Sequence, residues 1–316
     1  MNRGLTVMPL HSIDRLLFAG IAALTAFPVQ AMAGVPPLSV SWIHGQADCR
    51  SDSSPAFQVL QLNADSFILR QNKCLQYEAP FIYLLFGRER VLMLDTGSIE
   101  VASPVSEQDA KLYPLRRSVD EIIRTYTAAH RLNDLPLLVV HTHGHGDHIA
   151  GDGLFYRRLN TQVVAPGERS VKAFWRFSSM QGPAVAYDLG GRVLDVMPIP
   201  GHRADHIAIY DRNYGLLLAG DSLYPGRLYI ADWTAYRASI DRLQAFIAPR
   251  RLDYVLGAHI EMSDQPGVDY EVGATYQPSE HVLELGRAHL DELNRALQAI
   301  GPSPEVERHA DFIIDP

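Results

Sequence analysis

Short apolar runs bounded by turn residues recur along the chain after residue 50. Four of them are rich in β-branched and aromatic residues, and they predict strands: FQVLQLN (57–63), SFILRQ (66–71), FIYLLFG (81–87) and RVLMLDTG (90–97). The first two runs are separated only by a turn near Asn63–Asp65. They therefore predict a β-hairpin.

Helical periodicity appears between these strands and the later ones. Val119–Arg131 has an amphipathic pattern, with Ser118 as a candidate N-cap, and we expect another helix after Gly151. The continuous apolar run LPLLVVHT (135–142) is typical of a buried strand. Further strands are predicted at RVLDVMPIP (192–200), HIAIYD (206–211), YGLLLAGD (214–221) and LDYVLGAH (252–259), and a further helix at 235–247.

The C-terminal part of the chain also carries a helical pattern. Leu283, Leu290, Leu293, Leu297 and Ile300 fall on one helical face, which predicts a helical segment over about 278–300. Strands and helices are thus interleaved along the chain, with no low-complexity linker and no internal repeat. This order favours a single α/β domain of two or four layers.

The N-terminal residues have the pattern of a secretory signal peptide. Arg3 and Arg15 precede the apolar run 16–27, and Ala31 and Ala33 form an A-x-A arrangement. The run is short for a membrane span. We therefore expect cleavage after Ala33 and a periplasmic or secreted protein, with residues 34–316 as the mature domain and no stable membrane insertion after processing.

Composition and charge narrow the class of partner. The 316 residues are 47% hydrophobic and 20% charged, which is ordinary for a globular protein, and the formal net charge is −8. Phosphate binding needs a basic surface, so this balance argues against nucleic acid as a partner. The expected partner is a small-molecule substrate. The sequence does not indicate an oligomeric state.

The two cysteines, Cys49 and Cys74, flank the predicted hairpin. In an exported protein such a pair can form one disulfide, and cross-strand pairing can bring the two together. Two buried free thiols remain the alternative, because the sequence does not fix the separation of the Cα atoms.

The segment HTHGHGDH, residues 141–148, is the most unusual stretch of the chain. His143 and His145 are two residues apart, so on an extended segment their side chains point the same way and can hold one ion. Asp147 and His148 follow a glycine that lets the chain bend toward a second position. Imidazoles and carboxylates are zinc ligands, and the end of a buried strand is where α/β proteins build sites.

This motif resembles that of the metallo-β-lactamase superfamily, and three later motifs extend the resemblance. PIPGH supplies His202, LLLAGDSLY supplies Asp221, and YVLGAH supplies His259, each after a predicted strand. The resemblance covers roughly residues 55–265 and implies an αββα four-layer sandwich for residues 34–316. It also implies two Zn²⁺ ions per chain, the first held by His143, His145 and His202. The second would be held by Asp147, His148 and His259, and Asp221 would bridge the two.

In such a site the two ions share a water and lower its pKa toward about 7, so that hydroxide is the nucleophile. Asp147 would also orient the hydroxide or move a proton to the leaving group. The resemblance thus implies a zinc-dependent hydrolase. Outside these ligands, we expect Asp95 to orient a ligand or fix loops and His141 and His206 to support the site. His130, His281, His289 and His309 are expected on the surface.

The resemblance leaves the substrate open. Tyr224 lies three residues after Asp221, as in N-acyl homoserine lactonases, where that tyrosine can hydrogen-bond the substrate carbonyl; Arg227 and Tyr229 can shape a pocket. A carboxylic ester or lactone is therefore the expected substrate. The alternatives are a β-lactamase, a thioesterase of the glyoxalase II type, a mononuclear iron oxygenase and a non-catalytic binding protein on the same fold.

Overall fold

The structure, a computed structural model, describes residues 38–316. They belong to one compact unit that begins at Val35. The expected signal peptide, residues 1–33, lies outside the described residues. Within residues 38–316, no helix combines the length and the apolar character that a membrane span requires.

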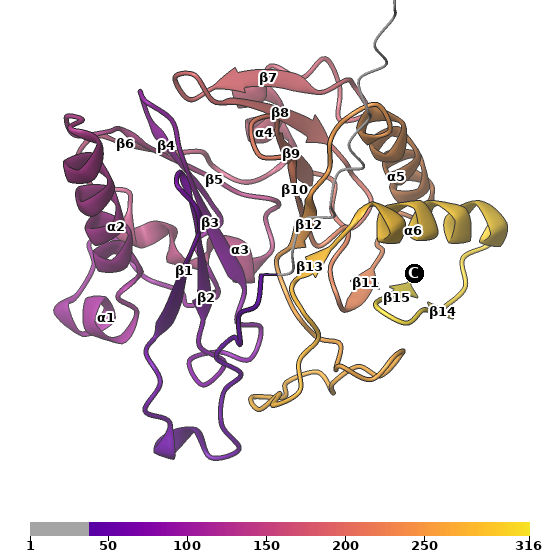
Figure 1. Cartoon of the computed structure of the whole chain (residues 1–316), viewed down its shortest axis with the longest axis horizontal. Helices are drawn as coiled ribbons and strands as arrows, with labels where there is room; N and C mark the ends of the chain where they lie inside the picture. Colours follow the sequence, from indigo (N-terminus) through magenta and orange to yellow (C-terminus); the bar gives the residue numbers. More distant parts are fainter. Residues whose placement is uncertain (1–37) are drawn as a thin grey trace, which may run out of the picture. The chain divides into compact units, whose positions relative to one another are not determined.

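The first of two large sheets is built from the N-terminal half of the unit (Figure 1). Strands β1 to β4 are antiparallel neighbours, whereas β4, β5 and β6 run parallel. Parallel neighbours need a crossover connection, and helix α2 supplies the one between β4 and β5. The bounds are β1 Phe57–Asn63, β2 Ser66–Gln71, β3 Phe81–Phe86, β4 Val91–Leu94, β5 Leu137–Val140 and β6 Thr161–Val163.

The second large sheet has the order β13-β12-β10-β9-β8-β7, and a small third sheet has the order β11-β15-β14. In the second sheet only β10 and β12 are parallel, with helix α5 between them. Its strands are β7 Val185–Asp188, β8 Val193–Pro198, β9 Ile207–Asp211, β10 Leu216–Gly220, β12 Tyr254–Gly257 and β13 Glu284–Leu285. The third sheet contains β11 Arg227–Tyr229, β14 Glu307–Arg308 and β15 Ile313–Asp315.

Helices cover the outer faces of the two large sheets (Figure 1). Helix α2 packs on the first sheet, and α5 and α6 pack on the second. The helices are α1 Glu107–Leu112, α2 Leu115–His130, α3 Gly146–Ile149, α4 Glu168–Trp175, α5 Trp233–Ile247 and α6 Arg287–Ile300. Short 3₁₀ turns lie at Cys49–Ser51 and Ala150–Leu154.

The central strands are apolar on both faces, and this pattern fixes the layer order. In β3, Phe81 and Tyr83 belong to the core between the two sheets, whereas Ile82 and Leu84 face the core beneath α2. Successive strand residues point to opposite faces, so a strand that is buried on both sides has no polar alternation. The predicted αββα four-layer sandwich is therefore confirmed.

Two predictions about helices were wrong. Helix α2 begins at Leu115 after Pro114, and the Ser118 hydroxyl donates to the Pro114 carbonyl inside the first turn, so Ser118 is not the N-cap. Proline suits a helix start because its φ is already helical. No long helix follows Gly151, which lies in the 3₁₀ turn; a Cβ there would lie 2.3 Å from the Thr96 carbonyl oxygen. That glycine allows close approach of two backbone segments.

Two other helices begin at residues that differ from the predicted ones. Helix α5 starts at Trp233, with the Asp232 side chain accepting from the Ala235 amide, two residues before the expected start. Helix α6 begins only at Arg287, because the preceding residues form β13 at the edge of the second sheet. Both differences concern element ends, where capping and tertiary pairing compete with periodicity.

The cysteines form a disulfide between Cys49 and Cys74, with Cα atoms 5.1 Å apart. It joins the segment before β1 to the segment after β2 and so closes the base of the predicted hairpin. A crosslink of this kind restricts the unfolded chain and fixes the segment from Lys73 to Glu78 to the rest of the unit.

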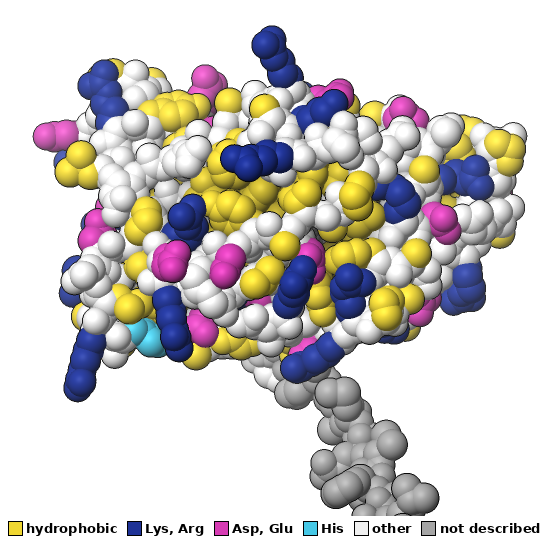
Figure 2. Space-filling view, turned by 90° about the horizontal axis from the view of Figure 1, so that it is seen from above, with side chains coloured by type: hydrophobic (Ala, Val, Ile, Leu, Met, Phe, Trp, Pro, Cys, Tyr) yellow, Lys and Arg dark blue, Asp and Glu magenta, His cyan; other side chains and the backbone are white. Residues whose placement is uncertain are grey.

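The face shown in Figure 2 mixes Lys and Arg with Asp and Glu around a hydrophobic area. The positive side chains on this face are interspersed with negative ones and do not gather into a stripe.

Candidate metal centre

The ends of four strands place the seven predicted ligands near one another. The loop after β5 carries His143 and His145, and α3 carries Asp147 and His148. The other three follow strands of the second sheet: His202 comes after β8, Asp221 after β10 and His259 after β12. Both sheets thus contribute ligands, and the seven residues form two groups, each with ligand atoms within 4.8 Å of one another.

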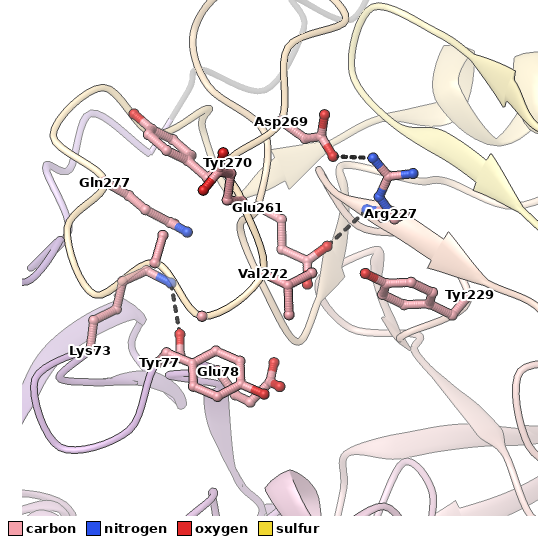
Figure 3. A pocket seen from close by; sticks show the side chains of 13 residues that line it. Lys73, Tyr77, Glu78, Arg227, Tyr229, Glu261, Asp269, Tyr270, Val272 and Gln277 are labelled. Carbon is pink, nitrogen blue, oxygen red and sulfur yellow. Dashed lines mark hydrogen bonds and ion pairs between the residues drawn. The ribbon is translucent and has the colours of Figure 1, made fainter.

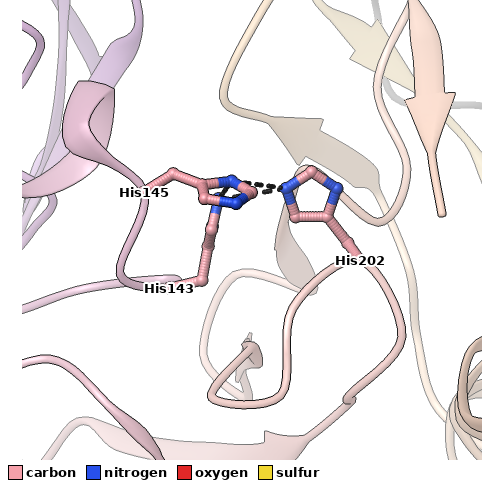
Figure 4. Close-up of side chains that lie close together, drawn as sticks. All are labelled: His143, His145 and His202. Atoms are coloured by element: carbon pink, nitrogen blue, oxygen red, sulfur yellow. Dashed lines mark hydrogen bonds between the residues drawn. The ribbon is translucent and has the colours of Figure 1, made fainter. Parts of the chain in front are cut away.

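The first group consists of three imidazoles (Figure 4). His143 Nε2 lies 2.9 Å from His145 Nδ1 and 3.1 Å from His202 Nε2. The remaining pair, His202 Nε2 and His145 Nδ1, is 3.0 Å apart. Ligands about 2.1 Å from a zinc ion in a tetrahedral site lie about 3.4 Å from one another, so this spacing suits a metal.

The second group combines two imidazoles with two carboxylates. Asp147 Oδ2 lies 3.2 Å from His148 Nε2 and 3.2 Å from His259 Nε2. The fourth member is Asp221. The group is buried except for Asp147, whose side chain is 20% exposed. That carboxylate is therefore the part of the group that solvent reaches.

Asp221 lies between the two groups. Its Oδ2 atom is 3.7 Å from His143 Nε2 and 3.6 Å from His202 Nε2. The same oxygen is 3.3 Å from His148 Nε2, and Oδ1 is 3.6 Å from His259 Nε2. One carboxylate is thus within reach of ligands from both groups, as a bridging ligand must be.

The donor atoms lack the partners that buried polar atoms normally have. His148 Nε2 and Asp221 Oδ1 are buried and accept or donate no hydrogen bond within residues 38–316. In the first group three ring nitrogens converge, and three imidazoles cannot all donate to one another. Buried polar atoms left this way indicate an ion, and the imidazole and carboxylate set fits zinc.

Electrostatics differ between the groups in the metal-free protein. Burial and the neighbouring imidazoles hold the pKa of His143 well below its usual value, and burial likewise lowers the pKa of His145. Burial opposes the charged form of His259 too, but Asp221 and Asp147 raise its pKa to about 9. The carboxylate pKa values of the second group are lowered in turn. Burial therefore favours the neutral form of His143 and His145, whereas the carboxylates of the second group favour the protonated form of His259.

Asp95 orients His148, a ligand of the second group, as predicted. Its Oδ2 accepts from His148 Nδ1 at 2.9 Å, and its Oδ1 accepts from the Thr142 amide at 2.7 Å. The residue has a φ of +69°, an unusual conformation for an aspartate that places it between β4 and the histidine loop. A carboxylate on the far nitrogen of a ligand histidine fixes its tautomer and ring orientation.

Backbone carbonyls fix the ring orientation of two other ligand histidines. His202 Nδ1 donates to the Tyr229 carbonyl at 2.6 Å, and His259 Nδ1 donates to the Glu78 carbonyl at 3.0 Å. Both bonds leave Nε2 directed at the centre. The second one crosses from the second sheet to the segment before β3, so it ties the centre to both halves of the unit.

His141 and His206 support the centre without joining either group. His141 Nε2 lies 3.3 Å from Asp152 Oδ2, and its Nδ1 contacts the His148 carbonyl oxygen at 3.2 Å. His206 Nε2 accepts from the Asp221 amide at 3.2 Å. Burial holds the pKa of His206 well below its usual value, so its ring stays neutral and can accept this bond.

Tyr224 is fully enclosed, with 2% of its surface exposed. Its hydroxyl donates to the Arg227 carbonyl at 2.5 Å and lies 3.1 Å from Glu261 Oε2. To reach a substrate carbonyl, the hydroxyl would have to leave the Arg227 carbonyl. The catalytic role assigned to Tyr224 stays a prediction, and the structure gives the hydroxyl a different partner.

The remaining histidines divide into two kinds. His130 is exposed, as expected. The three others, also expected on the surface, are half-buried beside carboxylates. His281 and His289 contact the two oxygens of Asp311 at 3.0 and 3.2 Å, and His309 contacts Glu292 at 2.8 Å. These contacts form where α6 packs against the C-terminal segment.

Sequence reasoning also missed supporting residues. Thr142 lies inside the histidine motif, and its hydroxyl donates to Asp95 Oδ2 at 2.9 Å while contacting His143 Nδ1 and His148 Nδ1. Its position between two histidines was the available signal. Glu78 and Glu261 carried no motif, and only tertiary contacts identify them.

Known proteins match this chain over the region of the site. The model of the metallo-beta-lactamase superfamily matches residues 78–259. An acyl-coenzyme A thioesterase, MBLAC2 of Homo sapiens, is 27% identical over 183 residues, which are 49% of this chain and 61% of the relative. A hydroxyacylglutathione hydrolase of Chromohalobacter salexigens is 32% identical over 108 residues, 33% of this chain and 41% of the relative. The chain thus spans from about two fifths to three fifths of the length of these two relatives.

Among solved structures, a metallo-beta-lactamase from Pontibacter korlensis is 17% identical, with a TM-score of 0.48. The match covers 77% of this chain and 99% of that one. A metallo-beta-lactamase from Hirschia baltica is 15% identical, with a TM-score of 0.45, over 65% of this chain and 91% of that one.

Proposed function

The chain belongs to the metallo-β-lactamase superfamily, and from this premise we propose that it is an exported hydrolase that uses two zinc ions to cleave a carboxylic ester or lactone. The observation that carries the proposal is the position of Asp221, within 3.7 Å of ligand nitrogens from both groups. A mononuclear iron site would not need the second group, and a non-catalytic protein would not need either.

The residues for each ion follow from the two groups. His143, His145 and His202 would hold one zinc; Asp147, His148 and His259 would hold the other; Asp221 would be shared. When bound, two such ions supply Lewis acidity for the substrate carbonyl and lower the pKa of a shared water toward about 7.

The protein itself supplies orientation and proton transfer. Asp147 is the exposed member of the second group, and its Oδ2 stands between two imidazoles. A carboxylate in that position can orient the attacking water and carry a proton to the leaving oxygen. Asp95 and the carbonyls of Glu78 and Tyr229 hold the imidazoles rigid, which reduces the reorganisation needed during the reaction.

Thioester hydrolysis is the second candidate. The names of both curated relatives, an acyl-coenzyme A thioesterase and a hydroxyacylglutathione hydrolase, describe enzymes of that class. The same ligand set can act on either bond, because the carbonyl is attacked in both cases. The substrate group beyond that carbonyl separates the two candidates.

Export is supported by two independent features. The first is the pattern of residues 1–33. The second is the Cys49–Cys74 disulfide, since such bonds persist in oxidising compartments. Mass spectrometry of the protein from its native host is expected to find a chain that begins near Gly34.

Metal analysis combined with a substrate panel tests the hydrolase proposal. Purified protein is expected to contain close to two zinc ions per chain, and removal by a chelator is expected to abolish hydrolysis of esters or lactones, with recovery on adding zinc. The panel includes matched thioesters and β-lactams as competitors. Full activity in rigorously metal-free protein would overturn the metal mechanism, and activity confined to β-lactams or thioesters would overturn the substrate class.

A further inference from the structure

A cavity of about 190 Å³ has walls that include two residues in contact with ligands of the metal centre (Figure 3). Its walls come from three places: the segment after β2, strand β11, and the long connection between β12 and β13. The carbonyls of Glu78 and Tyr229, which orient His259 and His202, belong to residues of this wall. These two contacts place the wall of the cavity directly next to the ligands His259 and His202.

The two cations of the wall already have carboxylate partners. Arg227 contacts Asp269 Oδ2 at 2.5 Å and Asp315 Oδ2 at 3.2 Å. Lys73 donates to the Tyr77 carbonyl at 3.1 Å and lies 3.9 Å from Glu280. Burial, followed by the nearby Arg70, lowers the pKa of Lys73 to about 7, so its amine carries only part of a charge at neutral pH. The cations therefore contribute little net positive charge to the cavity.

Three carboxylates of the wall have no cation within ion-pair distance in residues 38–316: Glu78, Glu261 and Glu271. Glu261 Oε2 accepts from the Arg227 amide and contacts the Tyr224 hydroxyl, and Oε1 has no hydrogen bond among residues 38–316. Glu271 lies at the exposed rim. The four carboxylates that line the cavity therefore outnumber its two cations.

Gln277 is a second and independent sign of a ligand. Its side chain points into the cavity (Figure 3), it is only 4% exposed, and its Oε1 has no hydrogen-bond partner in the described residues. A buried carbonyl oxygen without a donor costs free energy unless a ligand supplies one. The rings of Tyr77, Tyr229 and Tyr270 also line the cavity, and aromatic rings attract cations.

We propose that this cavity, the acidic pocket, binds an ammonium group of the substrate, with Glu78, Glu261 and Gln277 as acceptors. This inference rests on the proposed function, since it concerns the group attached to the bond that is cleaved. An ammonium group offers N–H donors to Gln277 Oε1 and charge to the carboxylates. Coenzyme A carries phosphates, which the same pocket would repel.

Binding probes test the pocket without requiring turnover. We would titrate the full-length, zinc-loaded protein with n-butylammonium, n-butanol and n-butanesulfonate, which share one alkyl chain and differ in charge, and follow binding by ligand-observed NMR. The ammonium is expected to bind at least about tenfold more tightly than the alcohol, and the sulfonate more weakly than either. Tighter binding of the sulfonate, or equal binding of all three, would overturn the inference.

Matched variants locate the binding. Glu78→Gln and Gln277→Leu are expected to remove most of the preference for ammonium, whereas Glu305→Gln, an exposed carboxylate outside the wall, is expected to keep it. Circular dichroism and zinc content would show that each variant is folded. A preference that survives both pocket substitutions would place the ammonium elsewhere and contradict the assignment.

A substrate series extends the test to turnover. Methyl 6-aminohexanoate, methyl heptanoate and methyl 6-sulfohexanoate differ only in the terminal group, and kcat/KM is expected to fall in that order. The NMR titration keeps the two proposals apart. Ammonium binding with no ester hydrolysis would count against the ester hydrolase alone, and hydrolysis with a preference for the sulfonate would count against the acidic pocket alone.

Discussion

The first ligand group offers a metal three imidazoles, whereas the second offers two imidazoles and two carboxylates. In the metal-free protein burial disfavours the charged form of His143 and His145, whereas Asp147 and Asp221 outweigh burial and favour the charged form of His148 and His259. The two neighbouring metal positions therefore differ in whether protons compete with the metal ion for the ligand atoms. A metal enters the first without displacing protons, but it must displace them from the second.

The largest expected effect comes from the residue that both groups share. Asp221→Ala removes the carboxylate that lies within reach of both groups, so turnover is expected to fall by about 10³-fold or more. Because Asp221 accepts no structural hydrogen bond through Oδ1, the fold is expected to survive, as circular dichroism would show. Turnover close to that of the unchanged protein would mean that Asp221 does not bridge.

Single substitutions in each group distinguish the two positions. His202→Ala and His259→Ala are each expected to reduce zinc content from about two ions to about one and to lower turnover by about 10²-fold or more. Elemental analysis gives the count, and cobalt substitution gives an absorption spectrum that differs between an all-imidazole site and a mixed site. Identical spectra from the two variants would contradict the assignment of an all-imidazole site and a mixed site.

Proton release provides a smaller but direct measure of the same difference. The pKa of His259 is raised from 6.5 to about 9, so the folded metal-free protein binds a proton that the unfolded chain releases between these values. The resulting stabilisation is complete below about pH 6.5 and is lost as the pH rises through about 9. Zinc binding near pH 7.5 is therefore expected to release about one or two protons from the second group.

Calorimetry in buffers of different ionisation enthalpy measures this release. The variant His202→Ala, which retains the second group, is expected to show it, whereas His259→Ala is expected to show less. Equal release from both variants would contradict the electrostatic contrast.

The smallest effect is expected at Tyr224. Its hydroxyl bonds the Arg227 carbonyl, outside both groups, so Tyr224→Phe is expected to lower turnover by less than about tenfold and to leave zinc content unchanged. A donor to the transition state would instead cost about 10²–10³-fold. A loss of that size in kcat on the best ester would show that the hydroxyl turns toward the metal centre during the reaction, as the sequence prediction requires.

Most of the strands and the ligand candidates could be predicted from the sequence, because their signals are local. Strands such as β3 and β5 are continuous apolar runs, because a strand that is buried on both faces carries apolar residues at successive positions. His143, His145 and His148 lie within six residues, and a strand end followed by glycines brings such side chains together without any long-range contact. His202, Asp221 and His259 each stand directly after a strand, which is also a local feature.

Only the tertiary structure decided the contacts between residues far apart in the chain. The Glu78 carbonyl meets His259 across 181 positions, and Gln277 reaches the cavity beside Lys73 because the connection after β12 folds over the segment after β2. The partners of His281 and His309 likewise depend on how α6 packs. Periodicity reports which face of an element is buried, but it carries no information about which distant segment covers that face, because that depends on how whole sheets pack.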